Sequence, residues 1–266
     1  MNSGARTIPF VKASACGNDF LLIDGALAPP DIAAFTRRIC DRHEGVGADG
    51  VEWMVPHFTA DVEIKLINAD GSPAEISGNG TRCVAAFVCS QLGKERISIL
   101  TGAGMKVCSL TDRRNSEYEF EIEMGDAVVS PELVLTMNGS QVHGTPVSMG
   151  NPHYVMFVRD FAADWQAHSA GIQRLPQFPQ GVNIEWVAVD SKHDVRARFF
   201  ERGAGETLSS GTGSCASAVA AIAAGFAESP VKVHAPGGTQ TVRKEGSKVF
   251  LRGPARLVCS GEFFLG

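Results

Sequence analysis

The sequence predicts an α+β protein of two pseudo-symmetric lobes, each a strongly curved mixed β-sheet around a central helix. Three observations support this prediction. Ser77-Gly78-Asn79-Gly80 is echoed by Ser210-Gly211-Thr212-Gly213 at an offset of 133 residues (210 − 77), half of the 266-residue chain. Gly17-Asn18 and Gly150-Asn151 stand at the same offset. Motifs that recur at one fixed offset indicate internal duplication. Short alternating apolar runs outnumber runs with helical spacing, which indicates more strands than helices.

The first half begins with two predicted strands within residues 8–24, joined by a turn at Gly17-Asn18. Asp31 is suited to cap a helix whose apolar side chains recur every three or four positions. Beyond it we expect strands at 51–56 and 61–67, a helix at 79–92 that ends at Gly93, and a β-meander at 96–100, 105–111 and 118–124.

The second half repeats this order. We expect strands at 142–149 and 154–158, a helix at 160–172, strands at 182–189 and 194–200, and a helix at 212–227. Strands at 231–235, 239–244, 248–253 and 257–264 follow.

The pattern resets near Gly125, so the predicted lobes are residues 1–124 and 125–257, with the last strand, 258–266, added to the first lobe.

Composition narrows the function classes. The net charge of −5 and the pI near 5.8 argue against nucleic acid as a partner. The first ten residues lack the apolar run of a signal peptide, and no run is long enough to span a membrane, which favours a cytoplasmic protein. The seven cysteines form no C-x-x-C pair and are expected to be buried free thiols. The dispersed histidines predict no metal site.

The two Ser-Gly-x-Gly turns are the strongest candidates for a functional site. A Gly-x-Gly turn that opens a helix presents backbone N–H groups outside the helical ladder, and the helix dipole favours an anion there. The amides of Gly78, Asn79, Gly211 and Thr212 are therefore candidates to hold a carboxylate.

A set of polar residues at turns predicts a shared pocket. Singly, each asparagine is typical of a turn, but their matched places in the two halves favour a common site; they are Asn18, Asn68, Asn151 and Asn183. Arg202 can grip a carboxylate with two hydrogen bonds, and Glu201 can accept from an ammonium group. His153 is a candidate to line the same pocket.

These motifs resemble those of the diaminopimelate epimerase family. The resemblance rests on seven stretches in order along the chain: Gly17-Asn18-Asp19-Phe20, Gly45-Val46-Gly47-Ala48-Asp49, Asn68-Ala69-Asp70-Gly71, Gly78-Asn79-Gly80, Gly150-Asn151-Pro152-His153, Glu201-Arg202-Gly203-Ala204-Gly205-Glu206 and Gly211-Thr212-Gly213. It covers nearly the whole chain.

The resemblance implies a barrel-like sheet around a central helix in each lobe. It implies an epimerase that needs no cofactor and interconverts LL- and meso-2,6-diaminopimelate, a precursor of lysine and peptidoglycan. One residue of each lobe acts on each face of the α-carbon, at the positions of Ser77 and Ser210. The amides of the two helix starts would hold the carboxylate of the reacting centre. The non-reacting centre would bind to Asn18, Asn68, Asn151, Asn183, Glu201 and Arg202. A homodimer is implied as well, although Cys259 stands where the family often has a tyrosine.

The two serines depart from the family, which has cysteine at both positions. A thiol at a helix N-terminus ionises near neutral pH, whereas a serine hydroxyl needs an adjacent base. Neither loop contains a histidine or lysine; Glu75 and Glu206 lie nearby in sequence and are more typical of structural loop residues. Two interpretations stay open: an epimerase whose two cysteines were replaced, and so inactive or impaired, or a natural relative with altered chemistry.

Two other functions remain compatible with these residues. One is a catalytically silent protein that binds a diamino acid. The other is a racemase or dehydratase of another amino acid, such as a hydroxyproline, on the same fold. The Glu201-Arg202 pair and the four asparagines favour a substrate with a second amino-carboxylate end.

Overall fold

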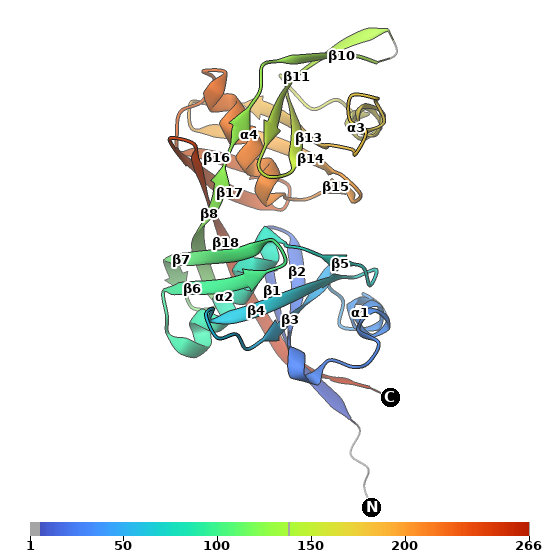
Figure 1. Cartoon of the computed structure of the whole chain (residues 1–266), viewed down its shortest axis with the longest axis vertical. Helices are drawn as coiled ribbons and strands as arrows, with labels where there is room; N and C mark the ends of the chain where they lie inside the picture. The colour runs from blue at the N-terminus through green and yellow to red at the C-terminus, as the bar shows by residue number, and fades with distance from the viewer. Residues whose placement is uncertain (1–5, 138, 266) are drawn as a thin grey trace, which may run out of the picture. The chain divides into compact units, whose positions relative to one another are not determined.

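The structure is a computed structural model that describes residues 6–137 and 139–265. The chain forms two compact units (Figure 1), and each is described by itself. Unit 1 contains Met1–Ile122 and Gly253–Gly266, and unit 2 contains Glu123–Arg252. The boundaries fall inside two strands, β8 (Glu117–Asp126) and β18 (Lys248–Phe264).

Unit 1 is a curved mixed sheet around one helix. Its strands pair in the order β1-β2-β3-β4-β6-β7-β8-β18, and β18 pairs again with β1, so the sheet closes on itself. The elements are β1 (Thr7–Ala15), β2 (Asn18–Asp24), η1 (Gly25–Leu27), α1 (Ile32–Cys40), β3 (Gly50–Val55), β4 (Val62–Asn68), β5 (Pro73–Ala74), α2 (Gly78–Leu92), β6 (Arg96–Thr101) and β7 (Gly104–Arg114).

Unit 2 has the same plan. Its main sheet runs β11-β12-β13-β14-β16-β17-β18. The elements are β9 (Val128–Val129), β10 (Leu133–Met137), β11 (Ser140–Ser148), β12 (Pro152–Phe157), α3 (Trp165–Gln173), β13 (Asn183–Val189), β14 (Asp194–Glu201), β15 (Gly205–Thr207), α4 (Gly211–Ala223), β16 (Val231–Ala235) and β17 (Gly238–Glu245).

The duplication seen in the sequence extends to every strand and α-helix from β1 to β8. Each has a counterpart in order from β11 to β18, with α1 matching α3 and α2 matching α4. Strand registers repeat as well: Phe20 pairs with Gly50 in the parallel β2–β3 pair, and His153 pairs with Asn183 in β12–β13. The predicted α+β fold of two similar lobes is therefore confirmed.

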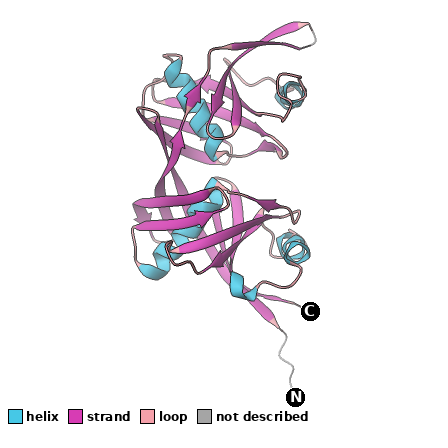
Figure 2. Ribbon diagram, viewed as in Figure 1, coloured by secondary structure: helices cyan, strands magenta, loops and turns pink. Residues whose placement is uncertain are grey.

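The two central helices are buried on nearly all sides, because both are rich in alanine and other small residues. Ala85 and Ala86 of α2 and Ala216 and Ala218 of α4 are inaccessible to solvent. Small side chains let the surrounding strands pack close to the helix, and Figure 2 draws each central helix among the strands of its unit. The outer helix α1 instead buries one face, on Phe35 and Ile39, and Asp31 caps it as predicted.

Several boundaries differ from the predictions. The helix expected from residue 160 begins at Trp165, and the helix expected to reach 227 ends at Ala223, because Gly225 follows with a positive φ. The two last predicted strands are one continuous strand, β18. Cys259 is exposed, unlike the other six cysteines, so the expectation of seven buried thiols was wrong there.

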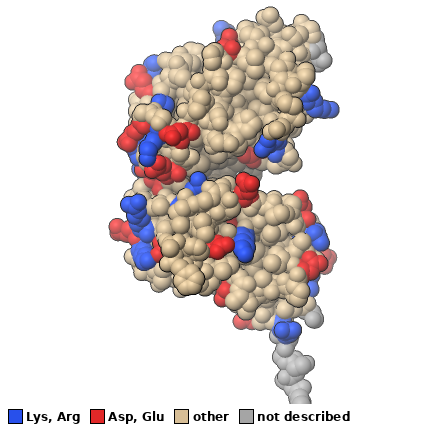
Figure 3. Space-filling view, viewed as in Figure 1, with Lys and Arg blue, Asp and Glu red and all other residues tan. Residues whose placement is uncertain are grey.

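The surface mixes both signs of charge. On the face drawn in Figure 3, Lys and Arg side chains lie among Asp and Glu. Among the described residues, no helix combines the length and the apolar character needed to cross a bilayer.

Candidate active site

In unit 1 the candidate site is the start of α2. Ser77 is the N-cap: its Oγ accepts from the Gly80 N–H at 3.1 Å, and its carbonyl oxygen accepts from the Thr81 N–H at 2.8 Å. The bond from Thr81 is the first regular bond of the helix, and the Ser77 side chain satisfies the Gly80 N–H, a group that the helix itself leaves without a partner. The hydroxyl is thereby held at the positive end of the helix dipole.

Polar contacts tie the neighbouring residues to this turn. Asn79 Nδ2 donates to Asn18 Oδ1 at 2.6 Å, and buried Arg82 donates to Asn79 Oδ1. Asn18 in turn donates to Asp49 Oδ2 at 3.0 Å. Two predicted substrate ligands, Asn18 and Asn79, are thus brought together and oriented by the surrounding side chains.

A charged cluster supports the Asn18 turn. Asp19 lies 2.9 Å from Lys12 Nζ and 2.8 Å from an Arg42 nitrogen. Burial opposes ionisation of Asp19, but its bonds to Arg42 and Lys12 outweigh burial and lower its pKa. The carboxylate therefore stays ionised and keeps the turn rigid.

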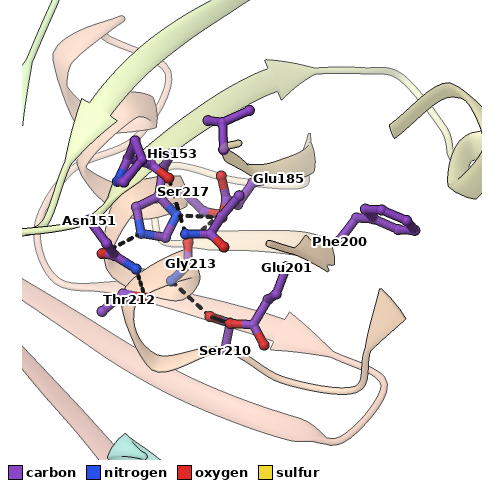
Figure 4. A network of polar contacts seen from close by, with 12 residues as sticks. Asn151, His153, Glu185, Phe200, Glu201, Ser210, Thr212, Gly213 and Ser217 are labelled. Atoms are coloured by element: carbon purple, nitrogen blue, oxygen red, sulfur yellow. Dashed lines mark hydrogen bonds and ion pairs between the residues drawn. The ribbon is translucent and has the colours of Figure 1, made fainter. Parts of the chain in front are cut away.

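In unit 2 the start of α4 has the same geometry (Figure 4). Ser210 Oγ accepts from the Gly213 N–H at 3.1 Å, and its carbonyl oxygen accepts from the Ser214 N–H at 3.0 Å. Asn151 Nδ2 donates to Thr212 Oγ1 at 3.4 Å, which matches the Asn18–Asn79 contact of unit 1. The predicted residues Asn151, Ser210 and Thr212 are therefore brought together.

One contact has no equivalent among the described residues of unit 1. Ser210 donates to Glu201 Oε1 at 2.6 Å, from a position only 4 % exposed. The sequence predicted Glu201 as a ligand for an ammonium group, and it offered no histidine or lysine in the loop as a base. The structure places a carboxylate directly on the Ser210 hydroxyl, because β15 folds back on β14 and returns the chain to the end of that strand.

The glutamates proposed from sequence proximity lie elsewhere. Glu75 and Glu206 are both exposed, and Glu206 accepts from Gln166 at 3.1 Å. These exposed positions agree with their interpretation as structural loop residues.

His153 lies behind this site in a buried chain of contacts. Its Nδ1 is 2.6 Å from Glu185 Oε1, and its Nε2 is 2.9 Å from Asn151 Oδ1. Burial raises the pKa of Glu185, while the neighbouring imidazole lowers it in part. His153 therefore orients Asn151.

Asn183 and Arg202 meet through the backbone. Asn183 Oδ1 accepts from the Arg202 N–H at 2.9 Å, and its Nδ2 donates to the Pro152 carbonyl oxygen at 3.0 Å. The Arg202 side chain is exposed and donates to the Gln180 carbonyl oxygen. Asn68 in unit 1 donates to Ser72 within its own turn, so its amide is occupied locally.

Two buried glutamates were not predicted from the sequence as residues of the site. Glu52 of β3 and Glu185 of β13 are 0 % and 1 % exposed, and they stand at the 133-residue offset of the duplication. A signal was available: each is a lone charge in an apolar run and precedes a tryptophan, in Glu52-Trp53 and Glu185-Trp186.

Comparison with known proteins bears on this site. The family model described as diaminopimelate epimerase matches residues 10–130 and 145–258. The diaminopimelate epimerase of Desulfitobacterium hafniense is 36% identical over 272 residues, covering 94% of this chain and 96% of the relative. That of Aromatoleum aromaticum is 38% identical over 276 residues, covering 96% of this chain and 98% of the relative.

Solved structures share the fold at low sequence identity. A Bacillus anthracis phenazine biosynthesis protein of the PhzF family superposes with a TM-score of 0.73 at 16% identity, covering 98% of this chain and 100% of that one. A hydroxyproline epimerase from Agrobacterium vitis superposes with a TM-score of 0.72, also at 16% identity, covering 98% and 93%.

Proposed function

The chain belongs to the diaminopimelate epimerase family, and from that premise we propose that it interconverts LL- and meso-2,6-diaminopimelate by proton transfer at one α-carbon. The observation that carries the proposal is the repeated helix start. Each unit opens its central helix with a serine whose Oγ accepts from the third helical N–H at 3.1 Å. A two-base epimerisation needs one such group for each face of the α-carbon.

The helix starts are suited to lower the free-energy barrier to removal of the α-proton. Removing an α-proton puts negative charge on the adjacent carboxylate, and preorganised N–H donors stabilise that charge most in the transition state. We propose that the amides of Gly78 and Asn79 in unit 1, and of Gly211 and Thr212 in unit 2, bind this carboxylate. The dipoles of α2 and α4 add to the stabilisation.

Glu201 is suited to make Ser210 a base. A serine hydroxyl needs a neighbour that takes its proton, and Glu201 Oε1 accepts that proton at 2.6 Å. As Ser210 Oγ takes the α-proton, its own proton passes to Glu201. A hydroxyl remains a poorer acid than a thiol, so we expect the rate with serine to be lower than with cysteine.

The remaining polar residues would bind the non-reacting end of the substrate. That end carries an ammonium group and a carboxylate, which match amide oxygens, a glutamate and an arginine. The proposed ligands are Asn18, Asn68, Asn151, Asn183, Glu201 and Arg202, with His153 holding Asn151 in place. Side chains and backbone supply every step, so the scheme uses no cofactor and no metal.

The wider role is part of the same proposal. Diaminopimelate serves lysine and peptidoglycan formation, and the seven free cysteines suit a reducing cytoplasm. We propose a homodimer as well. An apolar hollow of about 760 Å³ in unit 1, lined in part by Phe10, Leu92 and Ser260, lies beside the strand that carries Cys259 and offers a surface for it. Light scattering on the purified chain measures the assembly state.

The test is exchange of the substrate α-proton with deuterated water, followed by NMR, together with chiral separation of the LL and meso isomers. The chain as it stands is compared with the double variant Ser77→Cys/Ser210→Cys, and Ser209→Cys adds a thiol one residue away as the control. We expect exchange in the chain as it stands and an increase of roughly 100-fold in the double variant, because a positioned acid–base group typically contributes that much.

Two results would count against the proposal. Calorimetric binding of diaminopimelate without exchange in either form would instead identify a silent binding protein. Exchange of proline or hydroxyproline, without exchange of diaminopimelate, would identify a different substrate on the same fold.

A further inference from the structure

Glu52 is a buried carboxyl group without a visible partner. It lies on β3, it is 0 % exposed, and neither of its oxygens has a hydrogen-bond partner among the described residues. Burial raises its pKa to about 8, so the folded protein holds it as a neutral acid at pH 7. A buried unpaired carboxyl destabilises a fold, and its position therefore calls for a reason.

The side chain points at the first turn of α2. A Cβ built on Gly80 would lie 2.0 Å from Glu52 Oε1 and 3.3 Å from the Cβ of Ser77. Glu52 therefore packs directly against Gly80, whose N–H is the group that donates to Ser77 Oγ. Only glycine leaves room for the carboxyl at this point.

The duplication makes the placement more informative. Glu52 and Glu185 share one register, pairing with Leu22 of β2 and Val155 of β12. In unit 2, however, the Glu185 carboxyl is hydrogen-bonded to His153. The position of unit 1 that matches His153 is Phe20, which cannot form such a bond. The carboxyl of unit 1 is thus left available.

The two units also differ in what accompanies the serine. Ser210 has Glu201 of β14, and the matching position in β4 is Asn68, which carries no acid. Glu52 is the buried carboxyl beside the Ser77 turn, and it reaches that turn from the neighbouring strand β3. Each unit therefore places one carboxyl at the start of its central helix, from different strands.

We propose that Glu52 is a positioning residue that supplies and takes back the proton of Ser77, as the counterpart of Glu201 at Ser210; this rests on the proposed function. The Glu52 carboxyl and the Ser77 side chain both lie against Gly80, and the transfer requires the carboxyl to turn toward the hydroxyl about its last torsion, which is a soft one. When Ser77 acts as the acid, its O–H bond breaks and a C–H bond forms on the α-carbanion. The O–H bond of Glu52 then breaks, an O–H bond forms on Ser77, and Glu52 is left as a carboxylate. The reverse reaction returns the proton along the same path.

Few groups compete for this proton. The register neighbours of Glu52 are Leu22 and Leu66, both apolar. Cys83 on α2 is a titratable side chain near Glu52. Burial is the main cause that raises the pKa of Cys83, and the charge of Glu52 raises it as well. The proton on Glu52 is required when Ser77 acts as the acid, so kcat/KM in that direction should fall above a pH near 8.

The experiment compares the full chain with Glu52→Gln, which keeps the shape and removes the acid. We expect the variant to lose about 100-fold in kcat for α-proton exchange with little change in KM, since Glu52 does not touch the substrate. Its pH profile should lose the basic limb. Glu52→Asp, which keeps the acid, should restore part of the rate and the limb.

The outcomes separate this proposal from the proposed function. An unaltered rate and profile in Glu52→Gln overturns the role of Glu52 and leaves the function standing. If Glu52→Gln does not fold, the profile of the unaltered chain decides, because the absence of a basic limb near pH 8 contradicts the proposal. Exchange in Ser77→Cys/Ser210→Cys, with none in the serine chain, also contradicts it. Exchange in neither form overturns the function itself.

Discussion

Replacing Glu52 with glutamine should change how the stability of the protein depends on pH. In the unfolded chain the carboxyl ionises with a pKa near 4.5, whereas burial raises the folded pKa to about 8. Between these values the folded state binds a proton that the unfolded state releases. The free energy of unfolding therefore falls as pH rises from about 4.5 and stops falling above about 8.

The size of the effect follows from the pKa difference. Each pKa unit corresponds to about 1.4 kcal/mol, so the shift from 4.5 to about 8 amounts to roughly 3 to 5 kcal/mol. The stability of the parent relative to Glu52→Gln should decrease by this amount between pH 4.5 and pH 8. At the acid end the two proteins should differ only through packing and hydrogen bonding.

Urea unfolding at half-unit pH intervals, followed by circular dichroism, measures this difference directly. Glu52→Leu is the matched variant: it also lacks the titrating group but differs in polarity, so both variants should give parallel curves. Glu95→Gln, which removes a carboxyl exposed to solvent in unit 1, is the surface control. If the curves of the parent and of Glu52→Gln stay parallel from pH 4.5 to 8, the carboxyl is not held as a neutral acid and the reasoning fails.

Three further predictions concern the helix starts and the buried contact of His153 with Glu185. Gly80→Ala should lower the free energy of unfolding by about 1 to 3 kcal/mol, because its Cβ would meet Glu52 Oε1 at 2.0 Å. Gly78→Ala, whose Cβ would have no atom within 4 Å, should cost far less in the same urea assay. Equal losses would contradict this packing. Ser210→Ala should destabilise more than Ser77→Ala, about 1 kcal/mol for each lost cap plus the lost bond to Glu201, as thermal unfolding would measure; the reverse order would be evidence against that bond. His153→Phe should raise the pKa of Glu185 further. The free energy of unfolding should then fall by up to about 1.4 kcal/mol for each unit that the pH rises. An unchanged dependence of this free energy on pH would exclude the imidazole as the partner of Glu185.

More of the fold than of the site could be predicted from the sequence. The duplication was readable because the offset of 133 residues is preserved in short motifs, and the structure extends it to ten matched elements. Element ends were less accurate, as in the late start of α3 at Trp165, because capping and tertiary packing set them.

Within the site, residues near each other in sequence were predicted best. That both Ser-Gly-x-Gly turns open the central helices follows from local spacing, and the structure adds that each serine caps its helix through the third helical N–H. The contact of Ser210 with Glu201 was missed, because it depends on the hairpin of β14 and β15. The same holds for His153 and Glu185, which adjacent parallel strands bring together.

The sequence by itself determined the duplication, the two Ser-Gly-x-Gly turns that open helices and the family to which the chain belongs, because each depends on local spacing and residue type. The tertiary structure alone decided which acids accompany the serines. Glu201 reaches Ser210 through a strand hairpin, and Glu52 lies against Gly80 across the unit. The protonation of Glu52 is likewise a tertiary property, because it follows from the complete removal of the carboxyl from water.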